Sequence, residues 1–415
     1  MTPGPPDVFD PRLYAAGVPH DRYRVLRDDH PVSWQAEPAV LGWPEGPGFW
    51  AVARHADVVR VLKDASTYSS HVGATQIRDP DPADLPFIRG MMLNQDPPAH
   101  GRLRRLVSRA FTPRRVEAFE RAARDRATSL LRKALEADGS PTLDLVSTVT
   151  DDYALLNLAD LLGVPESDRA LLLHWTRRVI GYQDPDEAPQ PVLDAAGRPV
   201  NPRSPSALAD MFAYADELAA HKRAHPADDV MTTLATDPEL TGPERQMFFF
   251  LLTVAGNDTV RSAAPGGLSL LAENPSTYAQ LRANKLDLTT LTDELLRRHP
   301  PVLTFRRTAA RDTTLAGTRI ARGDKVVVLH ASANHDERVF ADPFRLDPHR
   351  TPNPHVSFGD GPHVCLGAHF ARLQLRILYE EVARALPDLR PAGPPRRLVS
   401  NFINGIKELP VHREA

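Results

Sequence analysis

The stretch Phe358-Gly359-Asp360-Gly361-Pro362-His363-Val364-Cys365-Leu366-Gly367 contains the single cysteine of the chain. We read it as a glycine-rich loop that leads into a helix beginning near Leu366. Glycines at 359, 361 and 367 allow a positive φ and let the backbone approach a flat ligand closely. Cys365 would then lie at a helix N-terminus, where amide N–H groups and the helix dipole favour a thiolate. A lone cysteine is usually a small buried apolar residue, but the order of the glycines, Phe358 and His363 favours a thiolate ligand.

The composition is that of an ordinary globular protein. The 415 residues are 42% hydrophobic and 25% charged, and a net charge of −3 gives no general attraction to nucleic acid or to an anionic membrane. A single cysteine excludes an internal disulfide scaffold. The N-terminal residues lack a signal-peptide pattern, and no run approaches the roughly 18 apolar residues that span a bilayer. We therefore expect a soluble, cytoplasmic protein that binds neither nucleic acid nor membrane.

Helical periodicity dominates the chain. Apolar residues recur every three or four positions in the segments 58–62, 103–111, 116–135 and 153–162. A further segment, 245–264, is apolar nearly all round over 247–254, which is typical of a central buried helix. Strand patterns are few and short, the best being 49–52, 318–320 and 325–329. These patterns predict a mainly α fold with small β-sheets, built as one large unit.

The central helix contains Ala255-Gly256-Asn257-Asp258-Thr259. The hydroxyl of Thr259 can bond back to the carbonyl of Ala255 and loosen the helix locally. Gly256 would leave room for a small ligand, and an acid beside an alcohol can relay protons from solvent. Taken alone, the pentapeptide also suits a core helix with a tolerated glycine and a polar edge. Pro265, followed by two glycines, removes one backbone hydrogen bond, so the helix either kinks there or ends early.

The motif F-G-x-G-x-H-x-C-x-G resembles the haem-binding signature of the cytochrome P-450 superfamily, and the resemblance extends from about Asp7 to Val411. It implies the P-450 fold as a single haem domain over residues 1–415, with haem b (iron protoporphyrin IX) as cofactor. Cys365 would be the axial ligand of the iron, and its thiolate would promote cleavage of the O–O bond. Asp258 and Thr259 resemble the A-G-x-D-T element of the family, which implies that they serve oxygen activation and proton delivery.

The same resemblance implies which residues hold and brace the haem. The loop residues Phe358, Gly359, His363 and Gly367 and the helix residues Ala255 and Gly256 would contact the ring. The cations for the two propionates would come from His100, Arg104, Arg307 and His363, since arginine binds carboxylates in a bidentate way. Glu294 and Arg297 form the E-x-x-R pair of the family, which would brace the thiolate loop together with Arg345. Arg350 is the reserve candidate for the third partner. Alone, an i, i+3 pair of this kind would be a weak surface ion pair.

The substrate pocket is expected to be apolar, which suits a hydrophobic small molecule. By resemblance it would be lined by Ile77, Phe87, Met91, Val254, Val302, Leu303, Phe402 and Ile403. The segment 183–205, rich in proline and aspartate, would be a lid. Several local matches, such as Ser400 to Lys407, resemble soluble bacterial members that oxidise steroids, branched lipids and terpenoids. The expected reaction is the insertion of one oxygen atom from O2 into a C–H bond of a steroid, terpenoid or related natural product.

The sequence has no dinucleotide fingerprint and no cysteine set for an iron–sulfur cluster, so we expect ferredoxin and ferredoxin reductase as electron donors. A basic patch would dock the acidic donor on the cysteine side; it comprises Arg102, Arg105, Arg109, Arg114 and Arg115. The chain would act as a monomer or a weak dimer. Two alternatives stay open. The first is a tailoring oxidase that epoxidises, desaturates or couples its substrate, including a substrate tethered to a carrier protein. The second is a haem-fold module that recruits other enzymes. The second should lack Asp258 and Thr259, and both are present.

Overall fold

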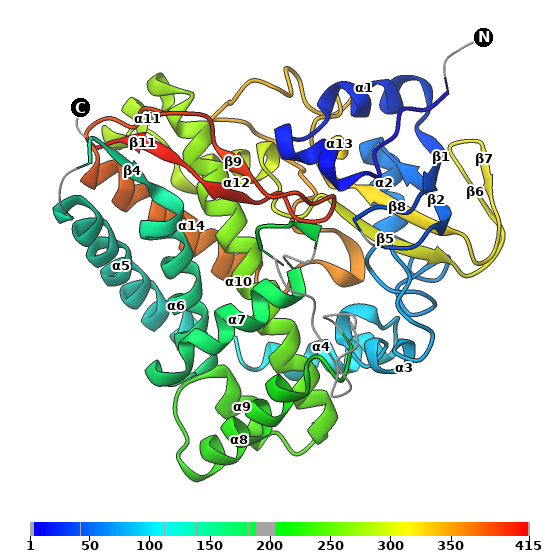
Figure 1. The fold of residues 1–415 in the computed structure, drawn as a ribbon, viewed down its shortest axis with the longest axis horizontal. Coiled ribbons are helices and arrows are strands. Elements are labelled where there is room, and N and C mark those ends of the chain that lie inside the picture. The colour runs from blue at the N-terminus through cyan, green and yellow to red at the C-terminus, as the bar shows by residue number, and fades with distance from the viewer. Residues whose placement is uncertain are drawn as a thin grey trace.

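The computed structural model describes residues 4–41, 43–111, 113–137, 140–180, 183–187 and 204–413. Helices make up one side of the molecule, and a twisted β-sheet with short helices around it makes up the other (Figure 1). The long helix α10 (Gly242–Ala272) runs through the helical part. The mainly α fold with small β-sheets that the sequence predicts is confirmed.

A capping box begins α10. The Thr241 hydroxyl accepts from the Glu244 amide, and the Glu244 carboxylate accepts from the Thr241 amide. From Met247 to Phe250 every side chain is buried, because α6 (Asp151–Leu162), α7 (Arg169–Ile180) and α8 (Ala209–Ala224) all pack against this part of the helix. This burial is what the nearly continuous apolar run of 247–254 predicts.

The largest apolar cluster of the described residues joins α6 and α10 to α5 (Pro113–Glu136), α12 (Leu288–Arg298) and α14 (Ala368–Ala385). A second cluster lies under α7 and α8 and contains Trp175 and the phenylalanines 248–250. The remaining helices are α1 His20–Asp29, α2 His55–Lys63, α3 Leu85–Ile88, α4 Ala99–Ser108, α9 Val230–Thr236, α11 Pro275–Arg282 and α13 His330–Ala333.

The main sheet has the strand order β1-β2-β8-β5-β3, and its strands are β1 Val32–Glu37, β2 Gly46–Val52, β8 Lys325–Leu329, β5 Thr304–Ala309 and β3 Tyr68–Ser69. Its pairs are antiparallel except for β2 and β8, which run parallel with Ala51 opposite Val327. The β5 strand therefore holds Arg307 beside the residues that follow β3. Three two-stranded sheets are formed by β6 Thr313–Leu315 with β7 Thr318–Ile320, β9 Arg396–Arg397 with β10 Ile406–Glu408, and β4 Thr142–Asp144 with β11 Pro410–His412.

The three predicted strands are all present as β2, β7 and β8, and the predicted helical segments lie within or next to α2, α4, α5, α6 and α10. Of the predicted lid, 183–205, the residues 188–203 lie outside the part of the chain that the structure describes. Across the described ranges, no helix is both long and apolar enough to cross a membrane.

Candidate active site

The loop before α14 has the strained geometry that its glycines predict. Gly359 and Gly361 have φ values of +69° and +68°, and the Cys365 amide donates to the Phe358 carbonyl oxygen at 2.8 Å. A Cβ at Gly361 would also lie 2.6 Å from the carbonyl oxygen of Leu62, so this loop packs closely on the end of α2. Gly367 is different: its φ is −86°, so the expectation of a positive φ is wrong there. It caps α14, which begins at Ala368.

Cys365 lies just before the first turn of α14. Burial raises the pKa of the Cys365 thiol, while the Gly367 backbone hydrogen bond and the charges of Arg104 and Arg372 act in the opposite direction. The residue nevertheless has exposed surface, so a ligand can reach its side chain. Arg372 lies over the Phe358 ring at 4.3 Å from its centroid, which fixes both beside the thiol. A sulfur that is held in place but accessible fits an axial ligand.

The predicted hydrogen bond within α10 is present, since the Thr259 hydroxyl donates to the Ala255 carbonyl oxygen at 2.7 Å. Gly256 has a different role from the one expected. A Cβ at this position would lie 2.8 Å from Cδ1 of Leu158 on α6, so the missing side chain makes room for Leu158. The absence of a side chain at Gly256 therefore serves a helix–helix contact, since Leu158 fills the space on this side.

Asp258 lies one residue before Thr259 and is almost completely buried, with 4% of its surface exposed. Burial raises its pKa to about 8, and the Arg261 charge only partly offsets this effect. Within the described residues its Oδ2 has no hydrogen-bond partner. A carboxyl group that changes protonation near neutral pH suits a proton relay.

The helix α10 does not end at Pro265 but continues to Ala272. Gly266 and Gly267 allow close packing there, because a Cβ on either would overlap the ring of His299 or of Tyr379. The Tyr379 hydroxyl donates to the Ala263 carbonyl oxygen at 3.1 Å and so satisfies an acceptor next to the proline. The Pro-Gly-Gly sequence therefore allows close packing near the C-terminal end of α10, beyond Thr259.

The E-x-x-R pair is fully buried, and Glu294 and Arg297 each have 0% exposure. Two parallel hydrogen bonds of 2.8 Å join them. Arg297 also donates to the Asn334 carbonyl oxygen at 2.7 Å, and the Asn334 side chain bonds to Ser357 Oγ and the Val356 amide. A continuous network thus runs from α12 to the residue before Phe358, which is the bracing arrangement that we expected.

Arg345 is not the third partner, and that prediction is wrong. Its side chain is exposed, while the adjacent Leu346 is buried in the main apolar cluster. The chain instead brings Arg350, the reserve candidate, back to Glu294, with its Nε 3.1 Å from Oε2. The sequence could not decide between them because the two arginines are equally basic and only the path of the intervening loop separates them.

The four residues expected at the propionates lie close to one another and to Cys365. The rings of His100 and His363 are 4.1 Å apart between centroids. Burial and the neighbouring positive charges lower the pKa of His363 to about 3, and burial lowers the pKa of Arg307 to about 10. Nδ1 of His363 has no hydrogen-bond partner in the part of the chain that the structure describes. Buried cationic groups and an unsatisfied nitrogen fit an anionic ligand such as a haem propionate.

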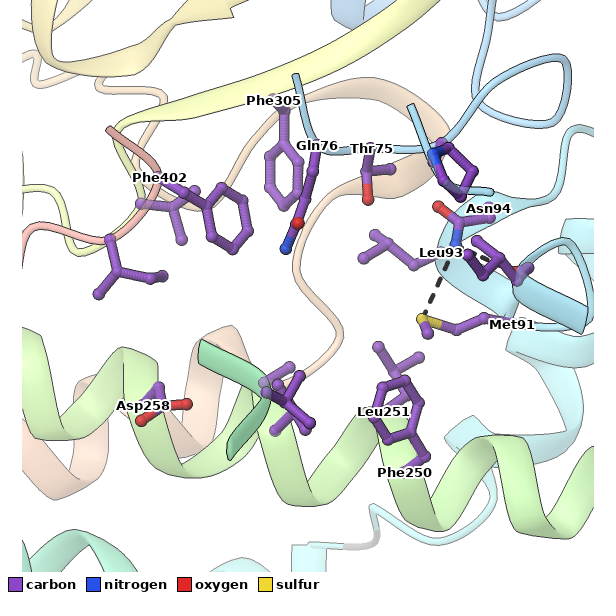
Figure 2. Close-up of a pocket in the computed structure, with 18 of the residues that line it drawn as sticks. Thr75, Gln76, Met91, Leu93, Asn94, Phe250, Leu251, Asp258, Phe305 and Phe402 are labelled. Carbon is purple, nitrogen blue, oxygen red and sulfur yellow. Dashed lines mark hydrogen bonds between the residues drawn. The ribbon is translucent and has the colours of Figure 1, made fainter. Parts of the chain in front are cut away.

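A cavity lies between α10 and the residues that follow α12 (Figure 2). Phe305, Phe402 and Gln76 face α10 across it. Ala255, Asp258 and Thr259 form part of its wall, so the proposed relay opens directly onto it. Six of the predicted contact residues line the cavity: Phe87, Met91, Val254, Val302, Phe402 and Ile403.

Two predicted contacts do not line this cavity. Leu303 follows the cavity residue Val302 and points the opposite way, into the cluster under the sheet, where it is 1% exposed. Ile77 alternates with Gln76 and Arg78 in the same manner, and it contributes to a small neighbouring cavity instead. The sequence reading missed Phe250, Leu251 and Phe305. Leu251 lies four residues before Ala255, so helical spacing could have found it.

The comparisons with known proteins agree with this geometry. The family "Cytochrome P450" matches residues 214–384. The chain is 36% identical to the steroid C26-monooxygenase of Rhodococcus jostii over 98% of this chain and 84% of that protein. It is 38% identical to the methyl-branched lipid omega-hydroxylase of Mycobacterium tuberculosis over 94% of this chain and 90% of that protein.

The fold is also similar to that of solved cytochrome P450 structures. The structure of Mycobacterium marinum cytochrome P450 CYP268A2 in complex with pseudoionone is similar with a TM-score of 0.84 and 36% identity, and the match covers 99% of this chain and 100% of that chain. The chain belongs to the cytochrome P450 family and is a P450 monooxygenase. The cofactor of this family is a haem with a thiolate ligand.

Proposed function

We propose that the protein inserts one oxygen atom from O2 into a C–H bond of a lipophilic small molecule, a steroid, a terpenoid or a related natural product. The observation that carries this proposal is the largely apolar cavity that has Thr259 and Asp258 in its wall. A cavity of this kind binds its ligand by excluding water, and a few polar groups orient the ligand. The names of the relatives agree, since one acts on a steroid and another on a methyl-branched lipid.

Cys365 is the residue that would hold the cofactor, haem b, through its sulfur. When bound, the haem activates O2 and transfers one oxygen atom to the substrate. Arg104, Arg307, His100 and His363 would hold the two propionates, because they place positive charge and hydrogen-bond donors beside the thiolate loop. Glu294, Arg297 and Arg350 would keep that loop in position.

The apolar side chains of the cavity would place the substrate and exclude water from the reacting carbon. Asp258 would take up a proton and pass it to the Thr259 hydroxyl, which would deliver it to the cavity. In the structure the hydroxyl donates its single proton to the Ala255 carbonyl, so it would have to turn away from Ala255 to donate into the cavity while its oxygen accepts the proton of Asp258. Protons are needed because each turnover reduces the second oxygen atom to water.

An external ferredoxin would supply the electrons through the basic patch near α4. Several of its arginines are already paired: Arg102 with Glu244, Arg109 with Asp237 and Glu239, and Arg115 with Asp228. Arg105 is exposed on the same helix. These pairs reduce the net positive charge of the patch, so Arg105 would contribute more to docking than Arg109.

The proposal is tested by turnover under ¹⁸O2 with purified ferredoxin, ferredoxin reductase and a panel of steroids, terpenoids and methyl-branched lipids. Oxygen insertion predicts a product that contains one ¹⁸O atom, as mass spectrometry would detect. A product that has lost two hydrogen atoms and gained no label would instead show a desaturase. Absence of any labelled product across the three substrate classes, with a reducible haem protein, would contradict the proposed substrate class.

A further inference from the structure

The substrate cavity has polar side chains at two separate places in its largely apolar wall. Asp258 and Thr259 of α10 form the first. Thr75 and Asn94 also line the cavity, and Figure 2 shows them well away from Asp258, on the opposite side of the space. A polar site away from the reacting end can hold a polar group of the substrate and so set its orientation.

Contacts with neighbouring residues fix the orientation of the Asn94 amide. Its Nδ2 donates to the Ile88 carbonyl oxygen at 3.0 Å, and the same nitrogen lies 4.0 Å from the Met91 sulfur. The reverse orientation would bring Oδ1 against the Ile88 carbonyl oxygen, and two acceptors repel each other. The amide nitrogen is therefore committed to the protein, and the carbonyl oxygen is the group that remains for a ligand.

Oδ1 of Asn94 has no hydrogen-bond partner among the residues that the structure describes, although Asn94 is only 3% exposed. An acceptor that is buried without a partner destabilises the protein, and a ligand that donates a hydrogen bond to it removes this cost. The oxygen is covered in the present conformation. Its neighbour Met91 has an unbranched, flexible side chain, which can move aside when a ligand binds.

Thr75 supplies the complementary group. Figure 2 shows its hydroxyl pointing into the cavity and the Asn94 oxygen turned toward Thr75. The Thr75 carbonyl oxygen accepts from the Arg306 amide of β5 at 2.9 Å, which holds this segment against the sheet. A hydroxyl group of the substrate could donate to Asn94 Oδ1 and accept from the Thr75 hydroxyl. A ketone has no proton to donate, so it would use Thr75 alone.

Two further residues of the cavity wall narrow the chemistry of the ligand. The positive charge of Arg78 disfavours a protonated amine as the donor. Gln76 also faces the cavity, but an amide offers both a donor and an acceptor, so it does not by itself favour an alcohol over a ketone. A neutral hydroxyl group fits this end of the cavity best.

We propose that Asn94 and Thr75 bind a hydroxyl group of the substrate, and that the substrate is therefore a lipophilic alcohol, such as a hydroxysteroid or a terpenoid alcohol, in preference to the matching ketone or aldehyde. This inference rests on the proposed function, because it narrows the substrate class of the same cavity. The anchored hydroxyl is not the reacting group. One oxygen atom of O2 enters a C–H bond at another carbon, which lies beside Thr259, and two electrons from the ferredoxin and two protons reduce the other oxygen atom to water.

The test compares the binding of matched alcohols and carbonyl compounds by optical titration of the ferric, haem-loaded protein. The probes are cholestanol with cholestanone and farnesol with farnesal, and the members of each pair differ only in the oxidation state of the carbon that bears oxygen. We expect the alcohol of at least one pair to bind roughly tenfold more tightly than its partner, because the carbonyl compound leaves the Asn94 oxygen unpaired.

Two variants separate the roles of the anchor residues. Asn94→Leu removes the acceptor, so the alcohol should lose its advantage while the affinity for the carbonyl compound stays the same. Thr75→Val removes a contact that both ligands share, so it should weaken both to a similar extent and preserve their ratio. Gln95→Leu is the matched control, because the Gln95 amide donates to the carbonyl oxygens of Arg89 and Gly90 and is not part of the cavity wall. Its ratio of affinities should equal that of the parent.

Equal or weaker binding of the alcohol in both pairs overturns the proposal, and so does a preference for the alcohol that survives in Asn94→Leu. A merely structural role for Asn94 would change both affinities alike. The comparison within the parent protein remains decisive even if Asn94→Leu does not fold. If both members of a pair bind equally and are oxygenated, the anchor fails and the proposed function stands. If none of the four probes binds, the proposed substrate class fails and this inference fails with it.

Discussion

The Thr259 hydroxyl donates a 2.7 Å hydrogen bond to the Ala255 carbonyl oxygen, one turn earlier in α10. This bond uses the only proton of the hydroxyl and leaves the lone pairs of its oxygen as acceptors, so donation into the cavity would require the hydroxyl to turn away from Ala255. In a proton relay the hydroxyl accepts from Asp258 and passes a proton on, so the side-chain oxygen is essential and the methyl group is not.

Thr259→Ala is therefore expected to bind substrate with the affinity of the parent but to convert several-fold less of it per electron consumed, because unprotonated oxygen species leave as peroxide. Thr259→Ser keeps the hydroxyl and should retain most of the product yield. The measurement is product and peroxide formed per NADH oxidised. Normal product yield in Thr259→Ala would show that Thr259 is not part of the relay.

Arg350 and Arg345 should respond differently to substitution, because only Arg350 contacts the buried Glu294. Arg350→Ala removes a hydrogen bond to the fully buried Glu294, which stays paired with Arg297, and loss of a hydrogen bond to a charged group costs about 1.5–3 kcal/mol. We expect a lower melting temperature and a lower haem content. The exposed Arg345→Ala should behave as the parent in both measurements, and equal effects of the two substitutions would contradict the assignment.

Close packing of α10 on α6 predicts that Gly256→Ala destabilises the protein by about 1–3 kcal/mol, because the new Cβ would lie 2.8 Å from Leu158. Combining it with Leu158→Ala should cost less than the sum of the two single changes, and chemical denaturation measures this coupling. Gly101→Ala on α4 is the control. Its Cβ would meet no atom within 4 Å, so it should be neutral or stabilising by about 0.5–1 kcal/mol. Additive effects at 256 and 158 would argue against the contact.

Electron transfer should depend more on Arg105 than on Arg109. Arg105→Glu places a negative charge on an exposed position of the basic patch, so we expect a several-fold higher KM for an acidic ferredoxin with little change in stability. Arg109→Glu would break its pairs with Asp237 and Glu239, and it should lower stability as well. Steady-state kinetics at two ionic strengths separates the effects, since docking through charges weakens in salt. Unchanged KM in Arg105→Glu would place the donor elsewhere.

The sequence predicted the parts of the site that depend on local pattern. The positive φ of Gly359 and Gly361 and the i, i+4 bond between Thr259 and Ala255 are local features, and they are present as expected, whereas Gly367 has a negative φ. The errors concern side-chain direction in irregular segments. Leu303 lies beside a β-bridge residue and Ile77 lies in a run of bends, and in both places neighbouring side chains point different ways, so an error of one position changes the direction.

Long-range partners could not be predicted for a different reason. Leu158 meets Gly256, and Asp151 and Glu187 meet Arg261, only because α6 and the residues after α7 fold against α10. No spacing in the sequence encodes these contacts. The identity of the third partner of Glu294 likewise depends on the path of the loop between Leu346 and Arg350.

An optical titration of the purified ferric protein would show whether Cys365 holds a haem next to a cavity that takes a lipophilic substrate. Steroids, terpenoids, methyl-branched lipids and polar controls of similar size would be added in turn, with Val254→Trp as a variant whose cavity is partly filled. We expect a saturable low-spin to high-spin shift with at least one lipophilic class, weaker binding in Val254→Trp and no shift with the polar controls. No shift with any lipophilic class, in a protein whose reduced carbon monoxide complex shows thiolate ligation, would contradict the proposed substrate class. Loss of thiolate ligation from the parent protein itself would contradict the role of Cys365.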